Sequence, residues 1–186
     1  VPAHWAAAAD RPGVHLLHDF SETTVDRIAA QIAQARRPGD IVVASIHWGP
    51  NWGYEIPSSQ RRFAHALIDR AQVSIVHGHS SHHPKAIERH ENAFIFYGCG
   101  DFLNDYEGIS GREEFRNDLS LMYFADVEVA GGKVTNLEMV PLQIRQFRLH
   151  HASGEDAEWL RGLLDRESAP FGVRVKMTEM HRLMAT

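Results

Sequence analysis

The stretch VSIVHGHSSHHPKAIE, residues 73–88, carries the pattern around which the rest of the chain is organised. Its first four residues form a short apolar run, interrupted only by Ser74, and predict a short buried strand. We expect the chain to turn at Gly78 and to present four imidazoles within seven residues, those of His77, His79, His82 and His83. Neutral imidazole is a good ligand for borderline transition metals. The stretch therefore predicts a metal site, and its alternative interpretation is a solvated loop that is rich in histidine.

Two further apolar runs end in a similar way. Residues 41–46 run into His47-Trp48-Gly49, and residues 93–97 run into Gly98-Cys99-Gly100-Asp101. Ligands in open α/β sheets bind beyond the carboxyl ends of the strands, and glycine there lets the backbone approach a bound group closely. We expect the small residues Ser80 and Ser81 to let the loop fold back. The imidazoles of His47, His79 and His82 should then gather around one point at the ends of two neighbouring strands.

Composition excludes several classes of function. The chain has 186 residues, 44% of them hydrophobic and 23% charged, which suits one domain with a sizeable core. A net charge of −5 offers no basic surface for nucleic acid. The single cysteine, Cys99, excludes an internal disulfide. No apolar run approaches the length of a membrane span. Thirteen histidines against four tyrosines favour metal or acid–base chemistry, and localisation stays open.

The remaining pattern predicts an α/β domain without repeats or linkers. We expect helices over residues 22–36, capped by Ser21, from Ser58 or Ser59 to residue 71, and after a capping box at residues 153–156. Strand, helix and strand in succession predict a parallel crossover. Further strands are expected at residues 86–89 and 93–97, in a hairpin at 119–129 and 134–145 with a bulge near Pro141, and at the edge at 172–177.

Three segments are expected to lie outside this regular structure. Residues 1–20 form an irregular lead-in with one helical turn over residues 6–9, and residues 178–186 a loose tail. Residues 101–117 form a polar loop, which we expect to be anchored by Phe102, Leu103 and Tyr106. His65, within the second helix, is interpreted as structural or solvated. The chain begins without a signal-like segment, and we expect the natural protein to extend upstream.

Three motifs resemble those of the capsule-synthesis (CapA, poly-γ-glutamate biosynthesis) family, which belongs to the calcineurin-like metallophosphatase superfamily. They are His47-Trp48-Gly49, Gly78-His79-Ser80-Ser81-His82 and the run from Tyr97 to Phe102. The family's corresponding motifs are His-Trp-Gly, Gly-His-His-Pro-His and Tyr-Ser-Leu-Gly-Asn-Phe, in the same order and at matching separations. The match covers roughly residues 40–102, and it also includes Ile87-Glu88. It implies a metallophosphatase-like mixed-sheet sandwich flanked by helices, of which residues 1–186 would be the C-terminal part.

The resemblance also implies a set of site residues. It makes His47, His79 and His82 metal ligands, whereas His77 and His83 have no counterpart. Three departures accompany it. The family's first half, with its aspartate and Asn-His motifs, has no counterpart here; Asn51 stands near a frequent glutamate, in a loop one residue longer; and Asp101 replaces an asparagine. The resemblance implies Mn, Zn, Fe or Mg as cofactor, two ions in the complete domain and at most one, held weakly, in this chain.

Two functions of different classes follow. The first is a dinuclear-metal hydrolase or transferase acting on a phosphoryl or related group. Here His79 and Asp101 are assigned to catalysis, and Asn51, Tyr54, Glu55 and Lys85 to substrate binding. The second is a non-catalytic component of capsule or polyglutamate assembly and export that binds polymer or partner. Expected partners are an anionic polymer or a phosphorylated small substrate, and components of a capsule or polyglutamate synthase. A closed structural zinc site is a weaker third alternative, because such sites usually take four ligands and include cysteine.

Overall fold

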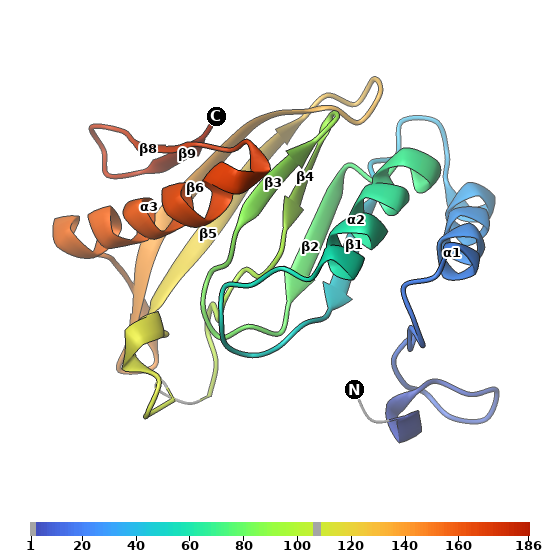
Figure 1. Cartoon of the computed structure of the whole chain (residues 1–186), viewed down its shortest axis with the longest axis horizontal. Helices are drawn as coiled ribbons and strands as arrows, with labels where there is room; N and C mark the ends of the chain where they lie inside the picture. The colour runs from blue at the N-terminus through green and yellow to red at the C-terminus, as the bar shows by residue number, and fades with distance from the viewer. Residues whose placement is uncertain (1–2, 106–108) are drawn as a thin grey trace.

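His47, His77 and His79 lie on a four-stranded sheet in the computed structural model, which describes residues 3–105 and 109–186 (Figure 1). Its strands are ordered β1-β2-β4-β3, with bounds Val43–His47, Ile75–His79, Ala93–Phe96 and Ile87–His90. β1, β2 and β4 run parallel, and β3 pairs antiparallel with β4. The sheet is therefore mixed, as expected. The carboxyl ends of the three parallel strands lie at the same end of the sheet.

Two helices pack beside this sheet. α2 (Ser58–Ala71) connects β1 to β2 as the crossover that two parallel strands require, and α1 (Glu22–Ala35) packs on α2. The predicted cap of α1 is confirmed, since the Ser21 side chain accepts a hydrogen bond from the Thr24 backbone. The predicted serine cap of α2 is wrong. Its N-cap is Pro57, which has no side chain able to accept a hydrogen bond, and Ser58 is already helical.

The second sheet has five strands. Its path is β5-β6-β9-β8, and β7 also pairs with β6. The bounds are Leu119–Val127 (β5), Val134–Arg145 (β6), Arg148–His151 (β7), Val175–Met177 (β8) and Leu183–Ala185 (β9). α3 (Gly154–Ser168) begins at the predicted Ser153 cap and crosses in front of β5 and β6 in Figure 1. Leu160 and Leu164 of α3 share one apolar core with Phe94 and Phe96 of β4, which joins the two sheets.

Several sequence expectations fail, and in the clearest case strand pairing between segments distant in sequence overrides the local pattern. Residues 183–185 of the expected tail form β9, between β6 and β8. The register shift in the hairpin lies at Asp126/Val127, while Pro141 pairs regularly with Leu121. The lead-in turn is a 3-10 helix at Ala3–Trp5, ahead of residues 6–9. Of the three expected anchors, Phe102 and Leu103 are exposed, and Tyr106 lies outside the described residues.

A buried carboxylate ties α2 to the first sheet. Glu88 of β3 accepts hydrogen bonds from Arg61 at 2.7 Å and from the Tyr97 hydroxyl at 2.5 Å. Its Oε1 also lies 2.9 Å from Nε2 of His65, which supports the structural interpretation of that histidine. Burial alone would raise the pKa of Glu88, but these hydrogen bonds outweigh it and hold the pKa below its usual value. The ionised form of Glu88 is therefore the one that the fold stabilises.

None of the helices in the described residues is long and apolar enough to cross a membrane.

Replacing Leu183 by alanine should show that β9 belongs to the core. The Leu183 side chain is fully buried, so Leu183→Ala should lower the free energy of unfolding by about 2–5 kcal/mol. Urea unfolding measures the change. Met180→Ala is the matched control, because Met180 is 75% exposed and should change stability little. Equal effects of the two substitutions would contradict the placement of β9.

Replacing Glu88 by glutamine should give a pH-dependent loss of stability. At pH 7 we expect Glu88→Gln to destabilise the fold by about 1–3 kcal/mol, because the hydrogen bonds to the carboxylate are weakened. A lowered folded-state pKa contributes stability that is present above the unfolded pKa and is lost as pH falls through the folded pKa. The difference between wild type and variant should therefore shrink below about pH 4. Urea unfolding at several pH values measures it, with the exposed Glu179→Gln as control. A difference that grows toward acid would contradict the mechanism.

Candidate functional site

Two of the predicted ligands are neighbours at the strand ends. His47 closes β1, His79 closes β2, and the two are register partners of the parallel pair. Their ring centroids lie 5.2 Å apart. His77 lies two residues earlier on β2, with its ring centroid 5.5 Å from that of His79. Its Nδ1 is 3.0 Å from Oγ of Ser45, which is its own register partner on β1. Three imidazoles are thus held side by side on two adjacent strands.

Gly78 has a role different from the turn that the sequence suggested. It lies within β2 and pairs with Ile46, so the strand continues through the expected turn. A Cβ at Gly78 would lie 2.3 Å from Nε1 of Trp48 and 2.5 Å from the carbonyl oxygen of Phe96. Trp48 is buried there and donates a hydrogen bond from Nε1 to the carbonyl of Tyr97 at 3.1 Å. Glycine is needed because an indole fills the space that any side chain would take.

The environment keeps the central imidazoles in their neutral form. Burial lowers the pKa of His77. The pKa of His79 is lowered first by burial and then by repulsion from His77 and His47. A neutral imidazole retains a lone pair on one ring nitrogen, and this is the form that binds metals. At neutral pH the electrostatics of the cluster therefore suit ligation or proton acceptance.

His82 makes contacts with other residues than His47 and His79 do. Its backbone N–H donates to the Asn51 carbonyl at 3.1 Å, and its Nδ1 is 3.1 Å from a carboxylate oxygen of Asp101. The Asn51 amide nitrogen is 3.2 Å from Nε2 of His82. These contacts fit the tautomer in which Nδ1–H donates to Asp101 and Nε2 accepts from Asn51. Asp101 is itself held through its carbonyl, which accepts from the Ser120 hydroxyl at 2.7 Å.

The loop between His79 and His82 is strained. Ser80 has a φ of 133°, in a region that residues with a side chain rarely adopt. Its hydroxyl donates to the Gly49 carbonyl at 3.2 Å, which fastens this loop to the one that follows β1. Backbone strain of this kind persists where the surrounding structure holds it, often at functional sites.

His83 points away from this surface into an aromatic cluster. It is fully buried, and its ring stacks on Phe115 at 4.5 Å and packs edge-on against Tyr54 at 4.7 Å. Its Nδ1 lies 3.0 Å from the Pro84 carbonyl, and within the described residues its Nε2 has no hydrogen-bond partner. Burial lowers the pKa of His83 to about 4. The side chain therefore acts as a neutral core residue.

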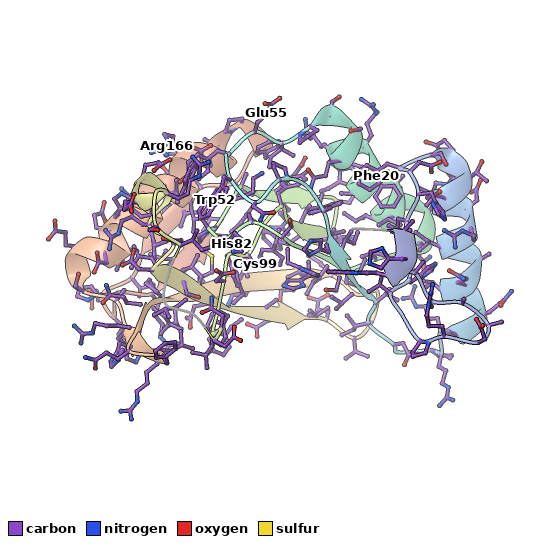
Figure 2. The ribbon with its side chains drawn as sticks, turned by 90° about the horizontal axis from the view of Figure 1, so that it is seen from below. Phe20, Trp52, Glu55, His82, Cys99 and Arg166 are labelled. Atoms are coloured by element: carbon purple, nitrogen blue, oxygen red, sulfur yellow. The ribbon has the colours of Figure 1, made fainter. Side chains whose placement is uncertain are left out.

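The residues predicted to bind substrate differ in accessibility. Asn51 and Glu55 are exposed on the loop after β1, and Figure 2 shows Glu55 farther out than Trp52, which lies close to His82. Tyr54 packs on His83 and Phe115, and burial raises its pKa to about 12. Lys85 is buried, burial lowers its pKa, and its ammonium donates to the Glu55 carbonyl at 3.1 Å. Tyr54 and Lys85 therefore position the loop, and Asn51 and Glu55 face solvent.

The described residues bring together part of the predicted metal site. His47 and His79 are adjacent, whereas His82 forms hydrogen bonds with Asp101 and Asn51. Within residues 3–105 and 109–186, no group of three or more His, Cys, Asp or Glu side chains is arranged to hold a metal ion by itself. The neutral donors fit a borderline transition metal, but the set is incomplete.

The sequence analysis counted His77 among the four clustered imidazoles but did not place it beside His47 and His79. The signal was available, because residues two apart on a strand point to the same face, and His77 and His79 have this spacing. Placing Gly78 in a turn concealed it.

The sequence of this chain is similar to those of several known proteins. Residues 1–106 match the family described as bacterial capsule synthesis protein PGA_cap. A probable polyglutamine synthesis accessory protein of Mycobacterium tuberculosis is 49% identical over 176 residues, which is 94% of this chain and 46% of that protein. The PGA biosynthesis protein CapA of Bacillus subtilis is 36% identical over 115 residues, 62% of this chain and 28% of that protein. The capsule biosynthesis protein CapA of Bacillus anthracis is 26% identical over 125 residues, 65% of this chain and 28% of that protein.

The chain spans just under half the length of the mycobacterial relative that it matches. The family match covers more than half of the chain and includes the strand ends that carry His47 and His79. This 186-residue chain belongs to the bacterial capsule synthesis (PGA_cap) family.

Proposed function

We propose that the chain forms part of an accessory protein of polyglutamate or capsule synthesis whose site binds a divalent metal and acts on a phosphoryl or related group. The observation that carries the proposal is the adjacency of His47 and His79 at the ends of two parallel strands, with ring centroids 5.2 Å apart. The names of the mycobacterial and Bacillus relatives refer to polyglutamine synthesis, PGA biosynthesis and capsule biosynthesis. They support the part of the proposal that concerns polyglutamate or capsule synthesis.

In this proposal the metal site is completed by residues outside the 186-residue chain. His47 and His79 are neutral donors on rigid strands, and His82 is the third ligand from this chain, as the family resemblance implies. A divalent metal held there would supply Lewis-acid polarisation of a substrate oxygen. The incomplete donor set within the described residues is consistent with a chain that covers 46% of its mycobacterial relative.

Asp101 fits a supporting role toward His82. Metal-binding histidines usually donate their second ring N–H to a carboxylate or carbonyl, which fixes the tautomer and the ring orientation. The contact between Asp101 and Nδ1 of His82 has this form, and it directs Nε2 toward the exposed Asn51. Asp101 would then set the orientation of His82, while Asn51 and Glu55 would meet substrate at the open side.

A second candidate function is a non-catalytic component that binds polymer or a synthase subunit. The observation that favours it is the absence, within the described residues, of a three-residue group able to hold a metal. The word "accessory" in the name of the mycobacterial relative agrees with such a role. The exposed loop of residues 51–55 would then serve recognition alone.

Metal binding by the full-length protein should depend on His47, His79 and His82. Calorimetric titration with manganese or zinc should show His47→Ala, His79→Ala and His82→Ala each losing at least about 100-fold in affinity, because each removes a donor. Asp101→Asn should lose about 10–100-fold, the range for outer-shell partners. His83→Phe, which keeps the aromatic contacts of a buried core residue, is the control and should bind as wild type. Circular dichroism melting establishes that each variant is folded. Equal loss in His82→Ala and His83→Phe would contradict the ligand assignment.

Turnover distinguishes the two candidate functions. We expect the full-length protein to hydrolyse a generic phosphoester such as p-nitrophenyl phosphate only with bound metal, and His79→Ala to abolish the reaction. Loss of turnover should parallel loss of metal across the variants. A metal-loaded protein without turnover on phosphomono- and phosphodiesters would reject the hydrolase and favour the binding component. Full activity in the His79→Ala variant would reject the site itself.

A further inference from the structure

A groove of about 840 Å³ runs along the outer edge of β1. Its floor is formed by β1 and its wall by α1 together with the lead-in, and His47 and His79 lie at its end. Ile28 and Ile32 of α1 and Leu17 and Phe20 of the lead-in line it. No Lys, Arg, Asp or Glu lines this groove within the described residues. The groove therefore does not suit an anionic polymer. Its lining is mostly apolar, like that of a protein core, but it is open to solvent.

The floor of the groove is an unpaired strand edge. β1 is the last strand of its sheet and pairs on one side only, with β2. The Val42 carbonyl accepts from Ser74, and the Trp48 N–H donates to the His79 carbonyl, so these two residues direct their backbone groups toward β2. Alternate residues of a strand direct them to opposite sides. The backbone groups of Val43, Ser45 and His47 therefore point into the groove, and no described backbone segment pairs with them.

Exposed apolar side chains gather along the same edge. Val43 is 53% exposed although it lies within a strand, and Trp5, Val14 and Phe20, which also line the groove, are exposed as well. An exposed strand edge without charged side chains is a template for pairing, and proteins usually cover such an edge or add charges to it. Here the described residues do neither.

We infer that in the longer protein an extended segment from outside these 186 residues adds to β1 as a further strand and fills this groove. Main-chain hydrogen bonds to Val43, Ser45 and His47 would hold it, and alternate apolar side chains would pack against α1 and the lead-in. The chain matches 46% of its mycobacterial relative, so a protein of that length has ample polypeptide for this strand. A second copy fits less well, because edge-to-edge pairing would bring its own α1 and lead-in against the same wall. The inference does not depend on metal binding or catalysis.

Residue-resolved hydrogen exchange on the full-length protein tests the inference. The amides of Ala44 and Ile46 face β2 and serve as the internal reference for a paired strand. If a strand is added, the amides of Val43, Ser45 and His47 should exchange as slowly as those two, within about tenfold. Exchange as fast as that of Gly131, in the open hairpin turn, would overturn the inference. Protection that appears only as protein concentration rises would also overturn it, since the occupant would then be a second copy.

A matched pair of substitutions in the full-length protein gives a second readout. Val43→Lys places a charge where the added strand would pack, and Val129→Lys makes the same change at a residue that is 63% exposed beyond the end of β5. We expect Val43→Lys to lower the melting temperature by more than about 4 °C and Val129→Lys by less than about 2 °C. Equal shifts would mean that Val43 stays exposed in the longer protein, and would overturn the inference even if both variants fold normally.

Discussion

The contact between Trp48 and Gly78 is the constraint on which the arrangement of the site depends. Trp48 follows β1, Gly78 lies in β2, and the indole nitrogen reaches the carbonyl of Tyr97 just after β4. One side chain therefore locks the carboxyl ends of three parallel strands. His47 and His79 occupy the positions next to this lock, so their separation is set by close-packed and buried neighbours. Rigid placement of this kind is what a ligand site needs, because donors on mobile loops would have to be ordered when the ligand binds.

Much of this architecture was predictable from the sequence because the signals were local. The apolar runs before His47 and before Gly98 predicted two strands correctly, and Ser21 and Ser153 marked helix starts. The adjacency of His47 and His79 followed from a general rule on the ends of parallel strands. These features depend on residues within a few positions of one another, and a single sequence displays such patterns directly.

The remaining features depend on contacts that no local pattern reveals. The sequence His77-Gly78-His79 is typical of a loop. It is nevertheless part of β2, because these three residues pair with Ser45, Ile46 and His47 of β1. β9 is a strand because β6 and β8 lie on both sides of it. The contact between His82 and Asp101 joins residues 19 positions apart, and the buried positions of His83 and Lys85 depend on an aromatic loop that closes over them. In each case, tertiary pairing overrides what the neighbouring residues favour.

The position of Trp52 has a spectroscopic consequence. Its ring lies 5.2 Å from that of His82 and 6.0 Å from that of His83, at the border between the site surface and the buried aromatic cluster. Indole fluorescence responds to the charge and polarity of nearby groups, and an imidazolium close to an indole quenches its emission. Trp52 is thus a built-in optical probe beside the one predicted ligand that lies on a strained loop. Because the chain has four tryptophans, its emission is isolated as the difference from a Trp52→Phe variant, and this difference reports on the surroundings of His82 without a label and without knowledge of the natural substrate.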